Sequence, residues 1–217
     1  MWAPEGDRLA YRSADGLTVL DIESADTARV LLEEPVTPSA WSPDGKLILM
    51  SRDPEGDDPT NARSDIFVLA VEGGHEAFAV VATSFSEYDG RISPDGRFLA
   101  YVSDETGRPE VWIASFPGGE RRQRVSRDGG SSPRFRTDGR ELFHVSAAAE
   151  AMSVPIQLGT SMELGEPQLL WESNFRAYGR FAAWEVFGEG ERFLVVTGGE
   201  VASNAEVVLN WPLALQQ

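Results

Sequence analysis

The sequence has no cysteine, no long apolar run and only two histidines among its 217 residues. The lack of cysteine excludes disulfides, thiolate metal sites and cysteine nucleophiles, although it fits an oxidising compartment as well as a reducing one. No stretch approaches the roughly 20 apolar residues of a membrane-spanning helix, and the first residues lack the basic start and apolar segment of a signal peptide. We therefore expect no membrane insertion by this chain.

Positive charge is scarce as well. The chain has 19 lysines and arginines against 35 aspartates and glutamates, which gives a net charge of -16. Because nucleic-acid binders normally present a basic surface, we expect no nucleic-acid partner. The arginines between positions 121 and 140 alternate with acidic residues, a pattern typical of a solvated strand rim and not of a binding patch.

What the sequence does contain is a repeated dipeptide. Five of the Asp-Gly and Glu-Gly pairs line up as copies of one phrase, and the glycines of these five are 39, 51, 43 and 51 residues apart. In "SPDG" the proline presets the first corner of a tight turn and the glycine takes the left-handed position that closes a hairpin. The turn residues predicted in this way are Gly6, Asp44, Gly45, Asp95, Gly96, Asp138, Gly139 and Gly190.

Apolar segments surround every copy of this turn. The segments that follow it align without gaps as "DRLAYRS", "KLILMSR", "RFLAYVS", "RELFHVS" and "ERFLVVT", all rich in strand formers. A short strand precedes each turn, a third strand follows, and a fourth is visible in the first four units. Four strands at periods of about 40 to 50 residues predict an all-β fold, a β-propeller of four-stranded antiparallel blades. A β-sandwich would not explain one turn recurring at the same point of every unit.

We expect one β-propeller domain over residues 1–217, with five blades at about 1–34, 35–84, 85–127, 128–172 and 173–217. Met1 to Pro4 align with Ala40 to Pro43, so the repeat starts inside an inner strand, and the fifth unit stops after its third strand. We interpret the chain as an N-terminally truncated part of a larger propeller. A five-bladed ring with an incomplete last blade is the alternative.

These residues resemble the TolB-type, WD-like propeller repeats, also called PD40 repeats, whose hallmark is a phrase like "WSPDGKxIAFxS" followed by "xIYVxxxxGG". Trp41 to Gly45 and Ser93 to Gly96 match the first phrase, and "RPEVWIASFPGG" matches the second. The later stretch "SRDGGSSPRFRTDGRELFHVS" and the terminal "EVVLNW" are similar to the C-terminal propellers of bacterial serine/threonine protein kinases. Unit four departs from the pattern, because Thr137 stands where proline is expected.

The resemblance implies a non-catalytic binding or sensing module within a larger bacterial signalling or envelope protein. Its partner would be a protein or a small anionic ligand, and no cofactor is expected. The chain has no kinase motif, since a Gly-rich loop, H-R-D and D-F-G are all missing. It would be cytoplasmic if Met1 is the true start, and periplasmic or otherwise extracytoplasmic if a longer exported or membrane-anchored protein contains it.

Residues suited to catalysis are few. No G-x-S-x-G elbow occurs, so a serine hydrolase is rejected. His144 stands at the strand position held by Tyr11 and Tyr101, which predicts a packing residue, and His75 falls in a connecting loop. The enzyme alternative is a carbohydrate-active hydrolase or lyase that uses paired carboxylates in the propeller channel. A third possibility is the accessory propeller of an oligopeptidase.

Two segments are candidate binding sites. Asp53, Glu55 and Asp57 alternate like the ligands of a calcium loop, but the glycine and glutamate that an EF-hand requires are missing, so a solvated acidic loop is favoured. The second candidate lies on the inner strands. Arg91 and Arg134 each precede the apolar anchor of such a strand and would together bind a carboxylate or phosphate in the channel. Glu185 has the same place in the fifth unit, so ion pairing between blades is the alternative.

Overall fold

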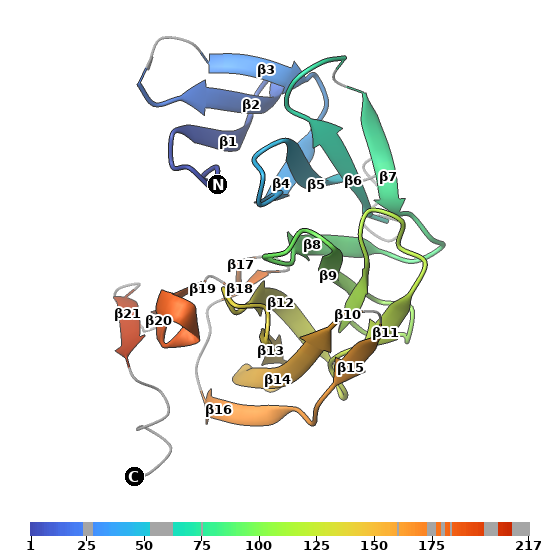
Figure 1. Ribbon diagram of the computed structural model, residues 1–217, viewed down its shortest axis with the longest axis vertical. Helices are drawn as coiled ribbons and strands as arrows, with labels where there is room; N and C mark the ends of the chain where they lie inside the picture. Colours follow the sequence, from blue (N-terminus) through green and yellow to red (C-terminus); the bar gives the residue numbers. More distant parts are fainter. Residues whose placement is uncertain are drawn as a thin grey trace.

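Five antiparallel sheets of three to five strands follow one another along an arc around a common centre, and a further sheet has two short strands (Figure 1). The computed structural model describes residues 1–23, 28–52, 63–74, 76–159, 161–172, 177–178, 181–182, 184–197 and 204–209. Blade 1 contains β1 (Arg8–Ser13), β2 (Gly16–Asp21) and β3 (Ala28–Leu32). Blade 2 contains β4 (Val36–Trp41), β5 (Leu47–Arg52), β6 (Asp65–Ala70) and β7 (Ala77–Val81). Blade 3 contains β8 (Glu87–Ile92), β9 (Phe98–Ser103), β10 (Glu110–Ser115) and β11 (Arg122–Arg124).

The last two blades depart from this regular pattern. Blade 4 contains β12 (Gly130–Phe135), β13 (Glu141–Ser146), the long β14 (Glu150–Leu158), β15 (Met162–Leu164) and β16 (Gln168–Glu172), and β14 pairs with both β15 and β16. Blade 5 contains β19 (Trp184–Phe187), β20 (Arg192–Thr197) and β21 (Asn204–Leu209), with the 3-10 turn η1 (Gly188–Gly190) between its first two strands. The short strands β17 (Ala177–Tyr178) and β18 (Phe181–Ala182) precede it.

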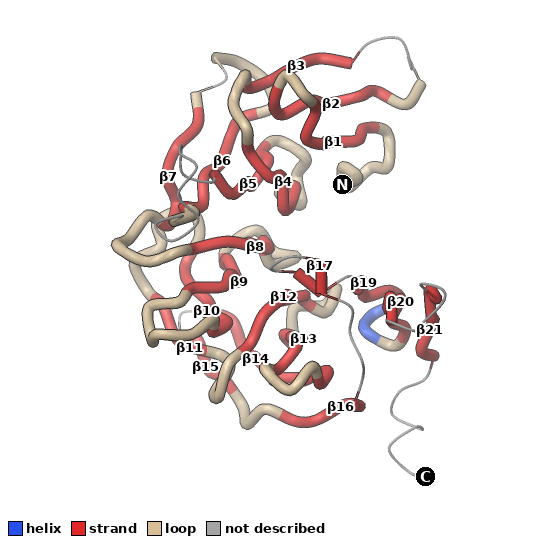
Figure 2. Tube along the Cα trace, turned by 180° about the vertical axis from the view of Figure 1, so that it is seen from behind, coloured by secondary structure: helices blue, strands red, loops and turns tan. Residues whose placement is uncertain are grey.

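The expected all-β propeller of antiparallel blades is therefore confirmed. In blade 1, Trp2 bridges Leu9 and takes the place of an inner strand. Seen from behind, β4, β8, β12 and β19 lie toward the centre, whereas β3, β7 and β16 lie at the periphery (Figure 2). None of the helical structure in the described residues is long and apolar enough to cross a membrane.

The repeated turn has the same hydrogen bonds in successive blades. In blade 2 the Ser42 hydroxyl donates to Asp44 Oδ1 at 2.6 Å and accepts the Leu47 amide at 2.9 Å. The Gly45 amide closes the turn onto the Ser42 carbonyl, with φ at +68°. Hydrogen bonds from Ser42 and the Lys46 amide lower the pKa of Asp44. The serine, the aspartate and the glycine of the sequence repeat are thus explained by the turn itself.

The proline of the repeat contacts the next blade. A Cβ atom placed on the turn glycine would lie 4.0 Å from Pro4 Cδ at Gly45, 4.0 Å from Pro43 Cδ at Gly96 and 3.9 Å from Pro94 Cδ at Gly139. Each corner proline thus lies against the turn glycine of the following blade. We call this chain of contacts the turn ring. In blade 4, where Thr137 replaces proline, the Arg136 side chain lies against Gly190 instead.

Apolar side chains fill the joint between each pair of blades. Along β5, Ile48 and Met50 face blade 1, whereas Leu49 faces blade 3, as the two-residue period of a strand requires. At the same positions of β9, Leu99 and Tyr101 face blade 2, and Ala100 faces blade 4. Both faces of a central blade are therefore buried, which is the physical reason that blades stack.

The left-handed conformation of the turn glycines predicts that a side chain at these positions is strained. Gly96 has φ at +73°, where an L-residue is strained, so Gly96→Ala should lower the free energy of unfolding by about 1–2 kcal/mol. Gly74→Ala is the matched control, because no described atom lies within 4 Å of the point that its Cβ would occupy and its φ is not left-handed. The control should change stability by less than about 1 kcal/mol in urea unfolding. Equal effects at the two positions would contradict the strain expected from the left-handed conformation of Gly96.

Candidate functional site

The inner strands carry a β-bulge at the same place in three successive blades. The pairing register shifts between Pro38 and Ala40 in β4, between Tyr88 and Arg91 in β8, and between Ser131 and Arg134 in β12. A bulge bends its strand and re-aims the side chains beside it. Within two of these bulges, Asp89 and Ser132 have positive φ values of 51° and 54°. The arginines that follow the bulges are thereby presented at equivalent points of neighbouring blades.

Asp89, Arg91, Arg134 and Glu185 form a group that we call the central ion cluster. Arg91 Nη2 lies 3.0 Å from Asp89 Oδ1, and Arg134 Nη1 lies 3.8 Å from the same oxygen. Arg134 Nε donates to Glu185 Oε2 at 3.2 Å. The two arginines predicted from the sequence are therefore brought together, and Asp89 is the shared counter-ion that sequence reasoning missed. A carboxylate two positions before a conspicuous inner-strand arginine was the available signal.

The arginines also bind the backbone of neighbouring inner strands. Arg91 Nη1 donates to the carbonyls of Ser39, in blade 2, and Gly90. Arg134 donates to the Trp184 carbonyl of blade 5 at 3.3 Å and to the carbonyl of Pro133 at 2.8 Å. The cluster therefore connects blades 2, 3, 4 and 5, as the inter-blade ion-pairing alternative expects.

Exposure differs sharply within the cluster. The Asp89 side chain is 2% exposed and that of Arg134 is 9% exposed, whereas the values are 21% for Arg91 and 54% for Glu185. Burial, followed by the neighbouring Arg134, lowers the pKa of Arg91. Asp89 Oδ2 is buried and has no hydrogen-bond partner among the described residues. The accessible side chains of the cluster are thus one guanidinium and one carboxylate, those of Arg91 and Glu185.

The other sequence candidates lie outside this cluster. Asp53, Glu55, Asp57 and His75 are outside the described residues. Within the described part of the chain, no group of three or more histidines, aspartates or glutamates is placed to hold a metal ion. The calcium site therefore stays a prediction.

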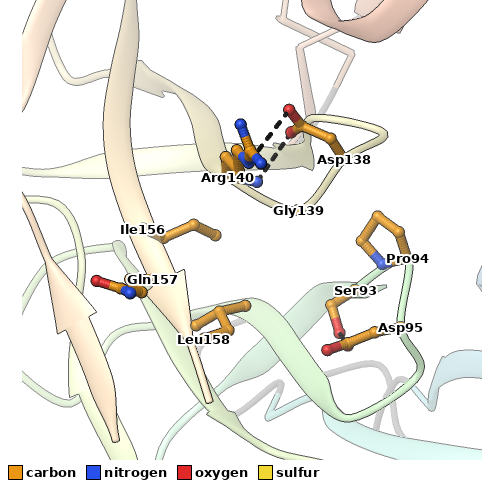
Figure 3. Close-up of a pocket in the computed structure, with 9 residues that line it drawn as sticks. All are labelled: Ser93, Pro94, Asp95, Asp138, Gly139, Arg140, Ile156, Gln157 and Leu158. Carbon is orange, nitrogen blue, oxygen red and sulfur yellow. Dashed lines mark hydrogen bonds and ion pairs between the residues drawn. The ribbon is translucent and has the colours of Figure 1, made fainter.

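A pocket of about 390 Å³ lies at the rim, between the turns of blades 3 and 4 and strand β14 (Figure 3). Asp95 and Asp138 stand at its two sides, and Arg140 lies beside Asp138. The backbone amide of Arg140 donates to Asp138 Oδ1 at 2.9 Å, so this carboxylate is part of its own turn. The Asp95 and Asp138 carboxylates accept hydrogen bonds from backbone amides of their own turns. The central ion cluster is therefore the candidate functional site.

Two fully buried glutamates form a further feature that sequence reasoning missed. Glu110 accepts hydrogen bonds from the Ser126 hydroxyl, from the Gly129 amide at 3.0 Å and from Arg108 at 3.0 Å. Glu87 accepts the Thr83 hydroxyl at 2.5 Å, and burial raises the pKa of Glu87. Both carboxylates hold connections between strands, which is a structural role.

His144 lies in the interior of blade 4, with 2% of its surface exposed. Neither ring nitrogen has a hydrogen-bond partner in the part of the chain that the structure describes, and burial lowers the pKa of His144 to about 4. Position 144 corresponds to Tyr101 in blade 3, which is also fully buried. The packing role predicted from the sequence agrees with this placement.

Burial of His144 predicts a loss of stability in acid. Its pKa is about 4 in the folded protein and 6.5 in the unfolded chain, so protons bind the unfolded chain first as the pH falls below 6.5. By this linkage the histidine should cost about 2 kcal/mol of folding free energy at pH 5 relative to neutral pH. His144→Met, which copies Met50 of blade 2, should remove that part of the pH dependence in denaturant unfolding. An unchanged pH profile would show that His144 does not titrate on unfolding.

No protein-family model matches the sequence, and no curated protein matches it. Several solved structures do match this chain. The protein is similar to TolB from Acinetobacter baumannii, with 16% identity, a TM-score of 0.72 and coverage of 96% of this chain and 50% of TolB. A puromycin-hydrolyzing peptidase of Mycobacterium tuberculosis has 20% identity and a TM-score of 0.63, over 93% of this chain and 36% of the peptidase. An oligogalacturonate lyase from Vibrio parahaemolyticus has 9% identity and a TM-score of 0.68, over 97% of this chain and 61% of the lyase.

This chain spans about half the length of TolB and about a third of the peptidase. At such identities the likeness establishes the fold alone, and the fold is a β-propeller with TolB-like structural neighbours.

Proposed function

We propose that this protein is a non-catalytic propeller binding module that holds a carboxylate of a protein partner at the central ion cluster. The observation that carries the proposal is the pairing of Arg134 with Glu185. The Glu185 side chain is 54% exposed, and it contacts the buried Arg134 through a 3.2 Å hydrogen bond. A carboxylate of the protein that is half exposed and makes a single 3.2 Å hydrogen bond to the arginine can be replaced by a carboxylate of a partner.

The geometry favours a ligand with a carboxylate next to a hydrogen-bond donor. The partly exposed Arg91 supplies N–H donors in a rigid fork, which suits a carboxylate. Glu185, once released from Arg134, would accept a hydrogen bond from a neighbouring backbone amide of the ligand, because its side chain is 54% exposed. A peptide segment that contains an aspartate or glutamate offers both groups.

The charge of the whole protein narrows the class of partner. A net charge of -16 repels polyanions at long range, even where a local cluster contains arginine. A partner segment with one acidic side chain among neutral or basic ones fits better than a chain of carboxylates.

A carbohydrate-active lyase is the second candidate, supported by the fold likeness to oligogalacturonate lyase. Acid-base catalysis at a carboxyl pair needs the environments of the two groups to push their pKa values apart. At the centre of this propeller Asp89 and Glu185 each contact an arginine instead, so both act as counter-ions. This arrangement supports binding over catalysis.

The sequence resemblance to kinase-attached propellers supports a sensing role within a larger bacterial signalling or envelope protein. The half-length coverage of TolB is compatible with that setting. In such a larger protein, the propeller would bind the partner and another part of the protein would respond to the binding.

The binding proposal predicts opposite effects of two substitutions in the cluster. A neutral peptide with one central aspartate should bind in an NMR titration, and Arg91→Gln should weaken binding by about tenfold or more because a charge-assisted hydrogen bond is lost. Glu185→Gln should strengthen binding several-fold, since the competing internal carboxylate is removed.

Arg97→Gln is the matched control, because Arg97 is an exposed arginine that pairs with Asp95 in the turn of blade 3. It should leave the dissociation constant unchanged. Equal effects of Arg91→Gln and Arg97→Gln would refute the proposed site. Trigalacturonate in place of the peptide tests the second candidate, which predicts an unsaturated cleavage product.

A further inference from the structure

A second pocket lies on the face of blade 4 that points toward blade 3. Its volume is about 370 Å³, and we call it the joint pocket. Leu142 and Val154 lie on the same face and pack against β10 of blade 3, so the pocket interrupts the apolar filling of this joint. The strands of blade 4 supply four of its lining side chains: His144, Ser146, Glu150 and Met152.

Larger side chains occupy the equivalent place in the preceding joint, between blades 2 and 3. Tyr101 of β9 pairs with Trp112 of β10, and both pack against blade 2. At the same repeat positions of blade 4, His144 pairs with Met152. Both replacements are smaller than the side chains they replace, and both line the joint pocket.

The outer strand shows a third change of the same kind. In blade 3, Arg122 of β11 lies over the Trp112 ring, with 5.5 Å between Cζ and the ring centroid. The strand register aligns Gln123 of β11 with Gln168 of β16. Pro167 therefore stands in the place of Arg122, and it lines the joint pocket. The pocket thus lies where two aromatic rings and a guanidinium fill the joint one blade earlier.

The polar side chain at the base of this pocket is unsatisfied. His144 is 2% exposed, and neither ring nitrogen has a hydrogen-bond partner among the described residues. A buried polar group without a partner costs free energy, so a ligand that supplies a hydrogen bond there is favoured. Because burial lowers the pKa of His144 to about 4, its ring is neutral at pH 7 and has one donor and one acceptor nitrogen.

The charge of the lining favours a cation. One arginine, Arg127, stands against three acidic residues, Asp128, Glu150 and Glu166. Arg127 pairs with Glu166 at 2.7 Å, and Asp128 pairs with Arg108 at 3.2 Å. The Glu150 carboxylate accepts the hydroxyl of Ser146 at 2.9 Å and has no arginine within ion-pair distance among the described residues. Since the whole protein is also acidic, a positive group is attracted to this pocket.

We propose that the joint pocket binds a small molecule in which an aromatic ring carries a positively charged amine. The ring would take the place that Tyr101 and Trp112 fill in the preceding joint, and the amine would pair with Glu150. A volume of about 370 Å³ lies in the range of small-molecule sites. The residues of the central ion cluster do not line this pocket, so the second site is independent of carboxylate binding at the cluster.

Tryptamine and tyramine are the probes, titrated into the full chain by calorimetry and by NMR. Both should bind, and indole-3-propionate, the anionic counterpart of tryptamine, should bind at least tenfold more weakly. The backbone amide signals of Gly129 and Ala147, which line the pocket, should shift on binding. The amide of Gly45, in the turn of blade 2, should not.

Two variants of the pocket test the same proposal. Met152→Trp copies Trp112 of blade 3, so it should fill the pocket and abolish binding of both amines. Glu150→Gln should weaken binding by about tenfold or more, because a charge-assisted hydrogen bond is lost. Glu163→Gln is the matched control, since Glu163 is an exposed glutamate of β15 outside the pocket, and it should leave the dissociation constants unchanged.

Three results would overturn the proposal. The first is that neither amine binds, and the second is that indole-3-propionate binds as tightly as tryptamine. The third is binding that a folded Met152→Trp variant and Glu150→Gln both leave intact, which would place the ligand elsewhere. If Met152→Trp loses the circular dichroism of the wild type, the comparison of Glu150→Gln with Glu163→Gln decides.

Discussion

Each blade of this protein is a twisted sheet with two apolar faces, and no helix of the described residues covers either of them. The faces are buried only where successive blades lie against each other, and the turn ring is one of the contacts between them. The corner proline of one turn lies beside the glycine of the next, so that a Cβ atom added to that glycine would be about 4 Å from the proline ring, from Pro4 to Gly139. The proline fixes its own φ, and the glycine provides the left-handed conformation. The short repeat phrase therefore specifies the turn inside a blade and the contact between blades together.

The centre of the arc shows how the same stacking produces a candidate binding site. A bulge in each of β4, β8 and β12 bends the inner strand beside the cluster, and Arg91 and Arg134, 43 positions apart, meet there. Two guanidinium groups around one buried carboxylate are stable because backbone carbonyls and Glu185 satisfy the remaining donors. The cluster thus contributes to the joints and presents polar groups at its exposed side. Structural and binding roles are compatible here because Glu185, the most exposed member, is the one that a ligand would replace.

Strand positions, hairpin turns and the propeller fold follow from the sequence by itself, because they depend on local rules: a two-residue apolar period, and Pro-Asp-Gly at a corner. The packing role of His144 follows in the same way from its alignment with Tyr101. Asp89 as the shared counter-ion, the contact of proline with glycine and the buried Glu87 and Glu110 came only from the tertiary structure. Each of these features depends on which side chains of separate blades meet. The rotation between blades and the bulges decide this, and the spacing of the repeat along the chain specifies neither of them. The sequence identified Arg91 and Arg134 as candidate binding residues. The distance between them and their exposure to a ligand were decided by the stacking of whole sheets.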